Sequence, residues 1–199
     1  PLTLALKALE RLGGVEEMTV ATYQSVSGAG NQAMEELASQ TLRLLMEEKI
    51  DPEIFSHRIA FNLIPMIGKV SDNGYSEEEM KVVNETRKIL GQDLHISCTA
   101  VRVPIFACHG EAVSVVTRED VSRDEVALAL AEGEGMTVLD APKEMVYPMP
   151  INAVEAFDVF AGRIRKHPTK ARAFDFWLVS DNIWKGAALN TIQIAEKLL

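Results

Sequence analysis

Five polar residues lie where the packing of a protein core would not require them. Gln24 ends an otherwise apolar stretch just before a glycine-rich turn, and Arg102 lies inside a valine-rich segment. His109 follows seven residues later in a Cys-His-Gly sequence, and we expect it at the far end of the strand that carries Arg102. Glu78 and Lys81 are three residues apart, which puts them on one face of a helix. An imidazole can transfer protons and a guanidinium can hold a planar anion, so these residues are the candidates for chemistry.

Each candidate also has a simpler interpretation, and taken one at a time the simpler interpretations are favoured. Glu78 and Lys81 can form an ion pair in solvent, which is common and worth little. Arg102 can face water, because alternation along a strand exposes every second residue. Gln24 can lie on the wet face of an edge strand, and His109 can be an exposed loop histidine. Single positions therefore do not define a site.

The composition is that of an acidic chain with room for one sizeable core. Of the 199 residues, 47% are hydrophobic and 25% are charged, the ordinary mixture for a soluble globular protein. The net charge of −9 argues against nucleic acid as a partner. There is no run of about 18 apolar residues, so we expect no membrane span. Cys98 and Cys108 lack metal-ligand spacing, which predicts a reduced, cytoplasmic protein without a metal site.

Periodicity and turn signals predict alternating helices and strands. Ser76 with Glu79 three residues later is a capping box, so the helix that follows is the clearest element. The helices are expected over residues 2–12, 31–48, 76–90, 123–132 and 185–199. The strands are expected over residues 15–26, 58–67, 95–106, 112–118, 136–140, 158–165 and 174–180. The pattern predicts an α+β fold, with a mixed β-sheet and helices packed on one face of it.

One glycine-rich turn could approach an anion. Ser27-Gly28-Ala29-Gly30 follows a predicted strand and opens a predicted helix, where backbone amides can face a negative group. It lacks the spacing of a dinucleotide fingerprint, and no such fingerprint occurs elsewhere in the chain. Alone, this turn is a weak signal.

Together, the segments resemble one family, the aspartate-semialdehyde dehydrogenases, in order from Pro1 to Leu199. The similarity is carried by Tyr23-Gln24-Ser25-Val26-Ser27-Gly28-Ala29-Gly30, Asp72-Asn73-Gly74-Tyr75, Glu77-Glu78-Glu79-Met80-Lys81, Val101-Arg102-Val103-Pro104, His109-Gly110-Glu111-Ala112 and Ser180-Asp181-Asn182. The resemblance implies the carboxyl-terminal domain of that family, whose fold is similar to that of glyceraldehyde-3-phosphate dehydrogenase.

The resemblance also implies a reaction and a role for each candidate. The family interconverts aspartyl phosphate and aspartate semialdehyde with NADP and inorganic phosphate, in the biosynthesis of lysine, threonine, methionine and diaminopimelate. By this resemblance His109 is the general acid and base, and Arg102 holds the substrate carboxylate. Glu78 pairs with the substrate ammonium, Lys81 with phosphate, and Gln24 places the acyl group. Such a substrate needs opposite charges in one pocket, and these residues supply them.

Further residues and partners follow from the same resemblance. Ser27 and Gly28 are expected to approach the NADP cofactor, and Asn182 to contact its nicotinamide end. The family's Rossmann-type NADP-binding domain is expected on the amino-terminal side of this chain. A homodimer through the broad sheet face is expected as well.

The nucleophile of the family does not coincide with either cysteine of this chain. Counting back from Gln24, the family's catalytic cysteine is expected a few residues before Pro1, and Cys108 is expected to be a packing residue. The isolated chain is therefore expected to be inactive. We expect residues 1–14 to be the helix after the nucleophile and residues 15–180 the substrate-binding and dimerisation domain. Residues 181–199 should pack on the NADP-binding domain.

Two alternatives belong to other classes of activity. A paralogue that keeps the fold without catalytic residues would be an interaction module, although the set of candidate residues argues against it. An acyl-phosphate reductase acting on acetylglutamyl phosphate would share the chemistry. The Glu-Glu-Met-Lys helix and the Arg-Val-Pro strand favour the aspartyl enzyme.

Overall fold

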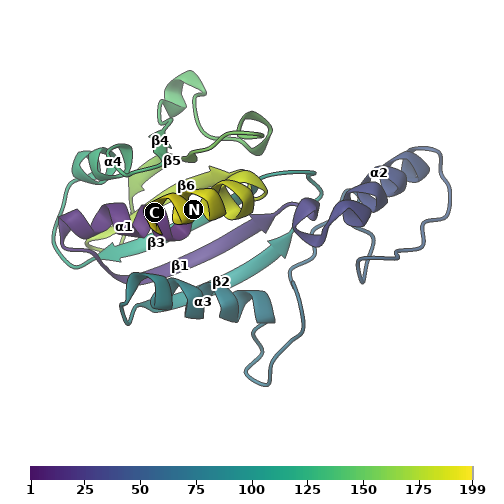
Figure 1. Ribbon diagram of the computed structural model, residues 1–199, viewed down its shortest axis with the longest axis horizontal. Helices are drawn as coiled ribbons and strands as arrows, with labels where there is room; N and C mark the ends of the chain where they lie inside the picture. Colours follow the sequence, from purple (N-terminus) through teal and green to yellow (C-terminus); the bar gives the residue numbers. More distant parts are fainter. Residues whose placement is uncertain (199) are drawn as a thin grey trace.

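The computed structural model describes residues 1–198 and contains one six-stranded mixed sheet with helices. Figure 1 shows the sheet running through the molecule, with α1 and α3 in front of it. The helices are α1 (Leu2–Leu9), α2 (Asn31–Leu45), α3 (Glu77–Leu90), α4 (Arg123–Ala131) and α5 (Leu189–Leu198). The strands are β1 (Val15–Gln24), β2 (His95–Arg102), β3 (His109–Thr117), β4 (Met136–Val138), β5 (Val159–Lys166) and β6 (Ala173–Ser180).

The strand order is β2-β1-β3-β6-β5-β4, and the sheet mixes parallel and antiparallel pairs. β1 lies parallel to β2 and antiparallel to β3. β6 lies antiparallel to both β3 and β5, whereas β4 and β5 are parallel. This arrangement confirms the predicted α+β fold with a mixed sheet.

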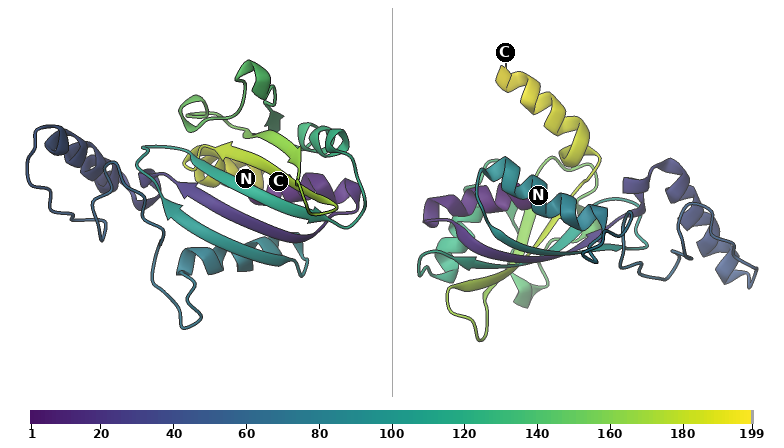
Figure 2. Two further views of the ribbon diagram at one scale, coloured as in Figure 1. Left: turned by 180° about the vertical axis from the view of Figure 1, so that it is seen from behind. Right: turned by 90° about the horizontal axis from the view of Figure 1, so that it is seen from below.

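The main core lies between one sheet face and three helices. In α1 the buried residues Leu2, Ala5, Leu6 and Leu9 follow the spacing of one helical face. They pack with buried side chains of α4 and of the inner sheet face, and partly buried side chains of α3 join them. Figure 2 shows α1 and α3 on one side of the sheet while the other side stays open. The helix of residues 1–14 therefore belongs to the same core as the sheet.

The start of α3 is fixed by the predicted capping box. The Ser76 hydroxyl accepts a hydrogen bond from the Glu79 amide at 3.4 Å, and the Glu79 carboxylate accepts one from the Ser76 amide at 2.7 Å. The second oxygen of Glu79 accepts a hydrogen bond from the amide of Ala100 in β2 at 3.0 Å. Glu79 therefore joins the cap of the helix to the strand beneath it.

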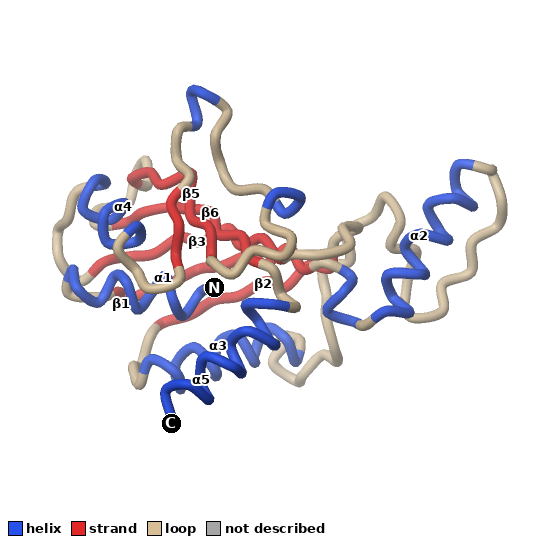
Figure 3. The backbone as a smooth tube through the Cα atoms, turned by 45° about the horizontal axis from the view of Figure 1, so that its top comes forward, coloured by secondary structure: helices blue, strands red, loops and turns tan. Residues whose placement is uncertain are grey.

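One helix, α2, does not pack on the sheet. α2 projects beyond the end of the sheet, as Figure 3 shows. It forms a small second core instead, made of Val26, Ala33, Leu37, Ile59, Ala60 and Ile64.

The strand predicted over residues 58–67 is absent, apart from a single bridge between Ile64 and Arg102. The amides of this stretch bond to α2 instead: Gln40 accepts hydrogen bonds from Ile59 at 2.8 Å and Ala60 at 3.2 Å. A side chain that satisfies these amides removes the need for a strand partner.

The closing helix stands apart from the body. α5 follows a π-helical turn at Trp184–Ala188, and none of its described side chains is buried. Figure 2 shows it rising away from the sheet. The last residue of the predicted helix, Leu199, lies outside the described residues. No helix among residues 1–198 is long and apolar enough to cross a membrane.

Candidate active site

The register of three neighbouring strands brings the predicted site residues together. Gln24 ends β1 opposite Arg102, the last residue of β2. On its other side Gln24 lies opposite His109, the first residue of β3. Residues opposite each other on neighbouring strands project to the same face of a sheet. Three side chains far apart in the sequence therefore meet at one end of the sheet.

This register corrects one expectation about His109. The sequence suggested that the histidine lies at the end of the strand that carries Arg102. In the structure His109 begins the separate strand β3, and β1 with Gln24 lies between it and Arg102. Cys108, just before it, has a φ of 67°, a left-handed conformation that is uncommon without glycine. The chain turns sharply at Cys108, and this turn directs the imidazole toward β1.

Ser25 connects the histidine and the arginine. Its amide donates a hydrogen bond to Nδ1 of His109 at 3.2 Å, and its hydroxyl lies 3.1 Å from the same nitrogen. Its carbonyl accepts a hydrogen bond from Nη1 of Arg102 at 2.6 Å. A Cβ at Gly28 would lie 3.1 Å from that Nη1 and 3.6 Å from Nε2 of His109. The glycine therefore lets the backbone of the turn cover both side chains closely.

The acidic side of the cluster comes from α3. Nε2 of Gln24 donates a hydrogen bond to Glu78 Oε1 at 3.2 Å, which ties the helix to the end of β1. Nζ of Lys81 lies 3.7 Å from Glu78 Oε2. The Lys81 side chain is 58% exposed, against 26% for Glu78. Glu78 therefore faces the cluster, while Lys81 extends from its rim into solvent.

Asn182 holds the turn between β1 and α2 and the start of β3. Its Oδ1 lies 3.3 Å from the hydroxyl of Ser25 and 3.2 Å from that of Ser27. The same oxygen accepts a hydrogen bond from the Cys108 amide at 3.1 Å. The three residues expected at the cofactor, Ser27, Gly28 and Asn182, therefore lie beside the imidazole of His109.

Burial governs the electrostatics of the cluster. The pKa of His109 is lowered to about 4, chiefly by burial; the charge of Arg102 contributes to the lowering, while the Cys108 backbone and Glu78 act to raise the pKa. Burial also lowers the pKa of Arg102, which Glu78 raises. Arg102 and Glu78 are thus close enough to influence each other, although the described contacts include no direct ion pair between them. A dipolar amino acid could place its charges between the two.

Neither cysteine has the properties of a nucleophile. Burial raises the pKa of Cys98 and of Cys108 to about 12 in each case, and both side chains are almost fully covered. A reactive cysteine needs a stabilised thiolate and access to substrate. Cys108 packs against Ala153 and Val179, which agrees with the expected packing role.

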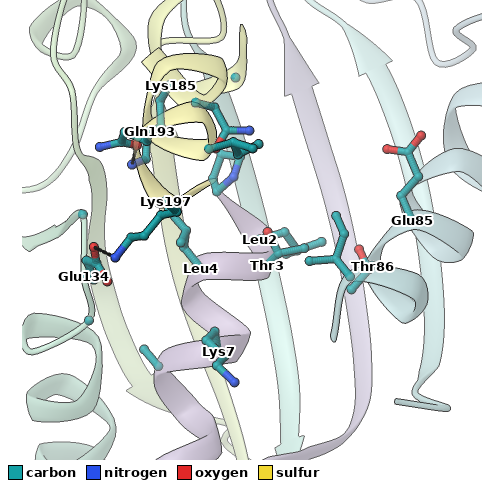
Figure 4. A pocket seen from close by; sticks show the side chains of 18 of the residues that line it. Leu2, Thr3, Leu4, Lys7, Glu85, Thr86, Glu134, Lys185, Gln193 and Lys197 are labelled. Atoms are coloured by element: carbon teal, nitrogen blue, oxygen red, sulfur yellow. Dashed lines mark hydrogen bonds and ion pairs between the residues drawn. The ribbon is translucent and has the colours of Figure 1, made fainter. Parts of the chain in front are cut away.

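A large cleft lies away from this cluster. It has a volume of about 1330 Å³ and lies between α1, α3 and α5, where Figure 4 shows Thr3, Thr86 and Lys185 among its lining residues. Gln24, Arg102 and His109 do not line it. The cleft exists because α5 stands off the body, so the candidate site itself is an open cluster at the end of the sheet.

Sequence reasoning missed two residues of this region. Ser25 is fully buried, and its amide, hydroxyl and carbonyl all have hydrogen-bond partners. Its place in the site was not recognised from the sequence because it directly follows the more conspicuous Gln24. Glu111 is 8% exposed, and its Oε2 has no hydrogen-bond partner among the described residues. The signal for Glu111 was its place two residues after His109, which puts both side chains on one face of β3.

A mixed sheet carries an imidazole, a guanidinium and a carboxylate at one end, a set of groups that suits a charged ligand. Comparison with known proteins specifies the class. Residues 6–185 match the family profile described as semialdehyde dehydrogenase, dimerisation domain. The chain belongs to this family.

The relatives with curated names agree with the family match. The aspartate-semialdehyde dehydrogenase of Bacillus subtilis is 46% identical over 206 residues, which cover 99% of this chain and 60% of that protein. The enzyme of Aquifex aeolicus is 42% identical over 201 residues, which cover 100% of this chain and 59% of that protein. The chain therefore spans about three fifths of the length of these relatives.

Solved structures have the same fold. Aspartate semialdehyde dehydrogenase II of Vibrio cholerae superposes with a TM-score of 0.95 at 40% identity, covering 99% of this chain and 58% of that one. The same Vibrio enzyme is also known in complex with ASA, at a TM-score of 0.94 and 40% identity, covering 98% and 58% of the two chains. These matches confirm the predicted family and its carboxyl-terminal fold.

Proposed function

We propose that this chain is the substrate-binding and dimer-forming part of an aspartate-semialdehyde dehydrogenase. The complete enzyme would convert aspartyl phosphate and NADPH to aspartate semialdehyde, NADP and phosphate, and the reverse. Its nucleophilic cysteine and NADP-binding domain would lie on the amino-terminal side of Pro1. The complete enzyme would act in the biosynthesis of lysine, threonine, methionine and diaminopimelate. Its location in the cytoplasm stays a prediction.

One observation carries the proposal. At the shared end of β1, β2 and β3, Gln24 lies between His109 and Arg102, and its amide donates a hydrogen bond to Glu78. The substrate has a carboxylate that suits the planar fork of Arg102 and an ammonium that suits Glu78. His109 is near enough to exchange protons with a group held between them.

Each further assignment has its own support. Gln24 would place the acyl group, because its amide is fixed by Glu78 and lies between Arg102 and His109. Lys81 would bind phosphate, because its exposed amine can reach a ligand at the rim. Ser27, Gly28 and Asn182 would approach NADP, because they border the imidazole that must act beside the nicotinamide.

The domain assignments are part of the same proposal. Residues 1–14 would lead from the nucleophile into the core, because the buried face of α1 packs in the same core as the sheet. Residues 181–199 would pack on the NADP-binding domain, because α5 exposes Ile192 and Ile194, each at 54%.

The experiment is a kinetic comparison in the complete protein that contains this chain. His109→Ala should lower kcat for oxidation of aspartate semialdehyde with NADP and phosphate by about 10²–10⁴-fold, the usual contribution of a general acid or base. His167→Ala is the matched control, because His167 lies in an exposed turn that bonds only its own neighbours. Wild-type turnover in His109→Ala would remove this residue from the mechanism.

The same experiment separates the proposal from its alternatives. A complete protein without any turnover would favour the interaction module. A preference for acetylglutamyl phosphate over aspartyl phosphate would indicate the other reductase. Turnover by the 199-residue chain alone would show that the nucleophile lies within it.

A further inference from the structure

Ser25 contacts both charged groups of the site while being fully buried. Its amide and hydroxyl lie 3.2 Å and 3.1 Å from Nδ1 of His109. Its carbonyl accepts a hydrogen bond from Arg102 at 2.6 Å. Because Ser25 has no surface exposed to solvent, its role follows from the contacts of its amide, hydroxyl and carbonyl groups.

The two groups of Ser25 that face the imidazole favour different ring tautomers. A backbone amide can only donate, so it favours an Nδ1 without hydrogen and a neutral ring that carries its hydrogen on Nε2. A hydroxyl can also accept, so it can pair with an Nδ1 that carries hydrogen. A histidine that takes a proton on Nε2 must begin with its hydrogen on Nδ1. The amide alone would therefore hold His109 in the form that cannot act as a base at Nε2.

The neighbours of the hydroxyl allow it to change direction. Its oxygen lies 2.9 Å from the hydroxyl of Ser27 and 3.3 Å from Oδ1 of Asn182. When Nδ1 carries hydrogen, the Ser25 oxygen can accept it and turn its own hydrogen toward Ser27 or Asn182. When Nδ1 is bare, the hydroxyl can donate to it. The hydroxyl can therefore pair with either form of the ring, whereas the amide of Ser25 has an acceptor only when Nδ1 is bare.

We propose that Ser25 is the positioning residue that sets the tautomer of His109, and that its hydroxyl allows the ring to act in turn as base and acid. The proposal rests on the function proposed above. The thiol of the nucleophile would give its proton to Nε2, leaving a thiolate and an imidazolium whose Nδ1–H is accepted by Ser25. Nε2 would later return that proton to the oxygen made negative by hydride addition.

The charges that face His109 are independent of the Ser25 side chain. They are Arg102 from β2 and Glu78 from α3. Replacing the hydroxyl removes none of them. A change in the titration of His109 would therefore report on the hydrogen bond at Nδ1.

The test compares Ser25→Ala and Ser25→Thr in the complete protein. Ser25→Ala keeps the amide and loses the hydroxyl. We expect kcat to fall by about 10-fold or more, with KM for aspartate semialdehyde nearly unchanged. The acidic limb of the pH profile of kcat/KM should move to lower pH, because the imidazolium loses its acceptor. Ser25→Thr keeps the hydroxyl and should restore both quantities.

The control is Thr169→Ala, which removes another hydroxyl 3.5 Å from a histidine Nδ1. That histidine, His167, is half-buried and lies outside the site, so turnover and pH profile should stay those of wild type. If Ser25→Ala keeps the wild-type kcat and pH profile, or if only KM rises, the proposal is overturned.

Nitrogen NMR of the imidazoles tests the tautomer without any turnover, so its failure can be told from failure of the proposed function. In wild type both ring nitrogens of neutral His109 should share the hydrogen. In Ser25→Ala the Nε2 signal should become that of a fully protonated nitrogen and Nδ1 that of a bare one. Identical spectra for His109 in the two proteins would overturn the role of Ser25 even if the enzyme is active.

Discussion

His109 has an environment that keeps the imidazole neutral until a ligand arrives. Burial lowers its pKa to about 4, below the range in which proton transfer at neutral pH is most efficient. Arg102 contributes to the lowering, so an anion bound to Arg102 would cancel part of that contribution and raise the pKa. The substrate carboxylate would therefore bring the histidine closer to its working range.

At Glu111 burial acts on the pKa in the opposite direction, because the group buried without compensation is a carboxylate. Burial raises its pKa, and Oε2 has no hydrogen-bond partner among the described residues. In the unfolded chain the carboxyl ionises near its ordinary pKa of 4.5, while the folded protein holds the proton to higher pH. Folding stability is therefore greatest below the unfolded pKa and is lost as pH rises through the folded one.

Glu111→Gln should consequently stabilise the protein at neutral pH by on the order of 1–3 kcal/mol, the cost of an unsatisfied buried polar group. The advantage of the variant should shrink as pH falls toward 4.5. Urea unfolding of both proteins between pH 4.5 and 8 measures it. Glu144→Gln, at an exposed carboxyl, is the control and should change little at any pH. An equal stability of wild type and Glu111→Gln at pH 8 would contradict the argument.

At the scale of elements, the capping box of α3 has a functional consequence that the capping box of α4 lacks. Ser76 caps the helix whose first turn carries Glu78, and Ser122 caps α4 through the same pair of hydrogen bonds to Glu125. α3 is tied to the site through Gln24. Fraying of its first turn should therefore displace Glu78.

Ser76→Ala and Ser122→Ala should each cost about 1 kcal/mol of stability, the usual value of an N-cap. Only Ser76→Ala should also raise KM for aspartate semialdehyde in the complete enzyme, because Glu78 would lose its fixed position. Thermal unfolding and steady-state kinetics measure the two effects. If both variants change KM equally, α3 has no special role in placing substrate.

The elements also show what could be predicted from sequence. Local signals gave the capping box of α3, the turn after Gln24 and most strands, because these depend on neighbouring residues. The strand predicted over residues 58–67 was wrong because amides of this stretch donate hydrogen bonds to Gln40, about 20 residues away. His109 was placed relative to the wrong strand because β1 inserts between β2 and β3, a long-range pairing without a local signature. The site residues were chosen by family resemblance, and their meeting point became visible only in the sheet register.

For the whole molecule, the open face of the sheet is the surface through which we predict the homodimer. The inner face is covered by α1, α3 and α4, whereas the outer face of the central strands presents Ala21 and Ala112 together with the aromatic side chains of Tyr23 and Trp177. Ala112 of β3 lies opposite Ala21 of β1 and Trp177 of β6, at the centre of that face. Membership of a dimerisation-domain family supports a homodimer, and a sheet face that no helix covers leaves an area on which a second copy can pack.

Ala112→Arg should therefore convert the homodimer to a monomer, because a long charged side chain at the centre of the face would have to be buried without a partner. Light scattering on the complete protein measures the change in mass. Thr169→Arg, in the exposed turn between β5 and β6, is the control and should leave the mass unchanged. Circular dichroism should show the same fold in both variants, since Ala112 is only partly buried and faces away from the core. A dimer that survives Ala112→Arg would place the interface on another surface, and the projecting helix α2 would be the next to test.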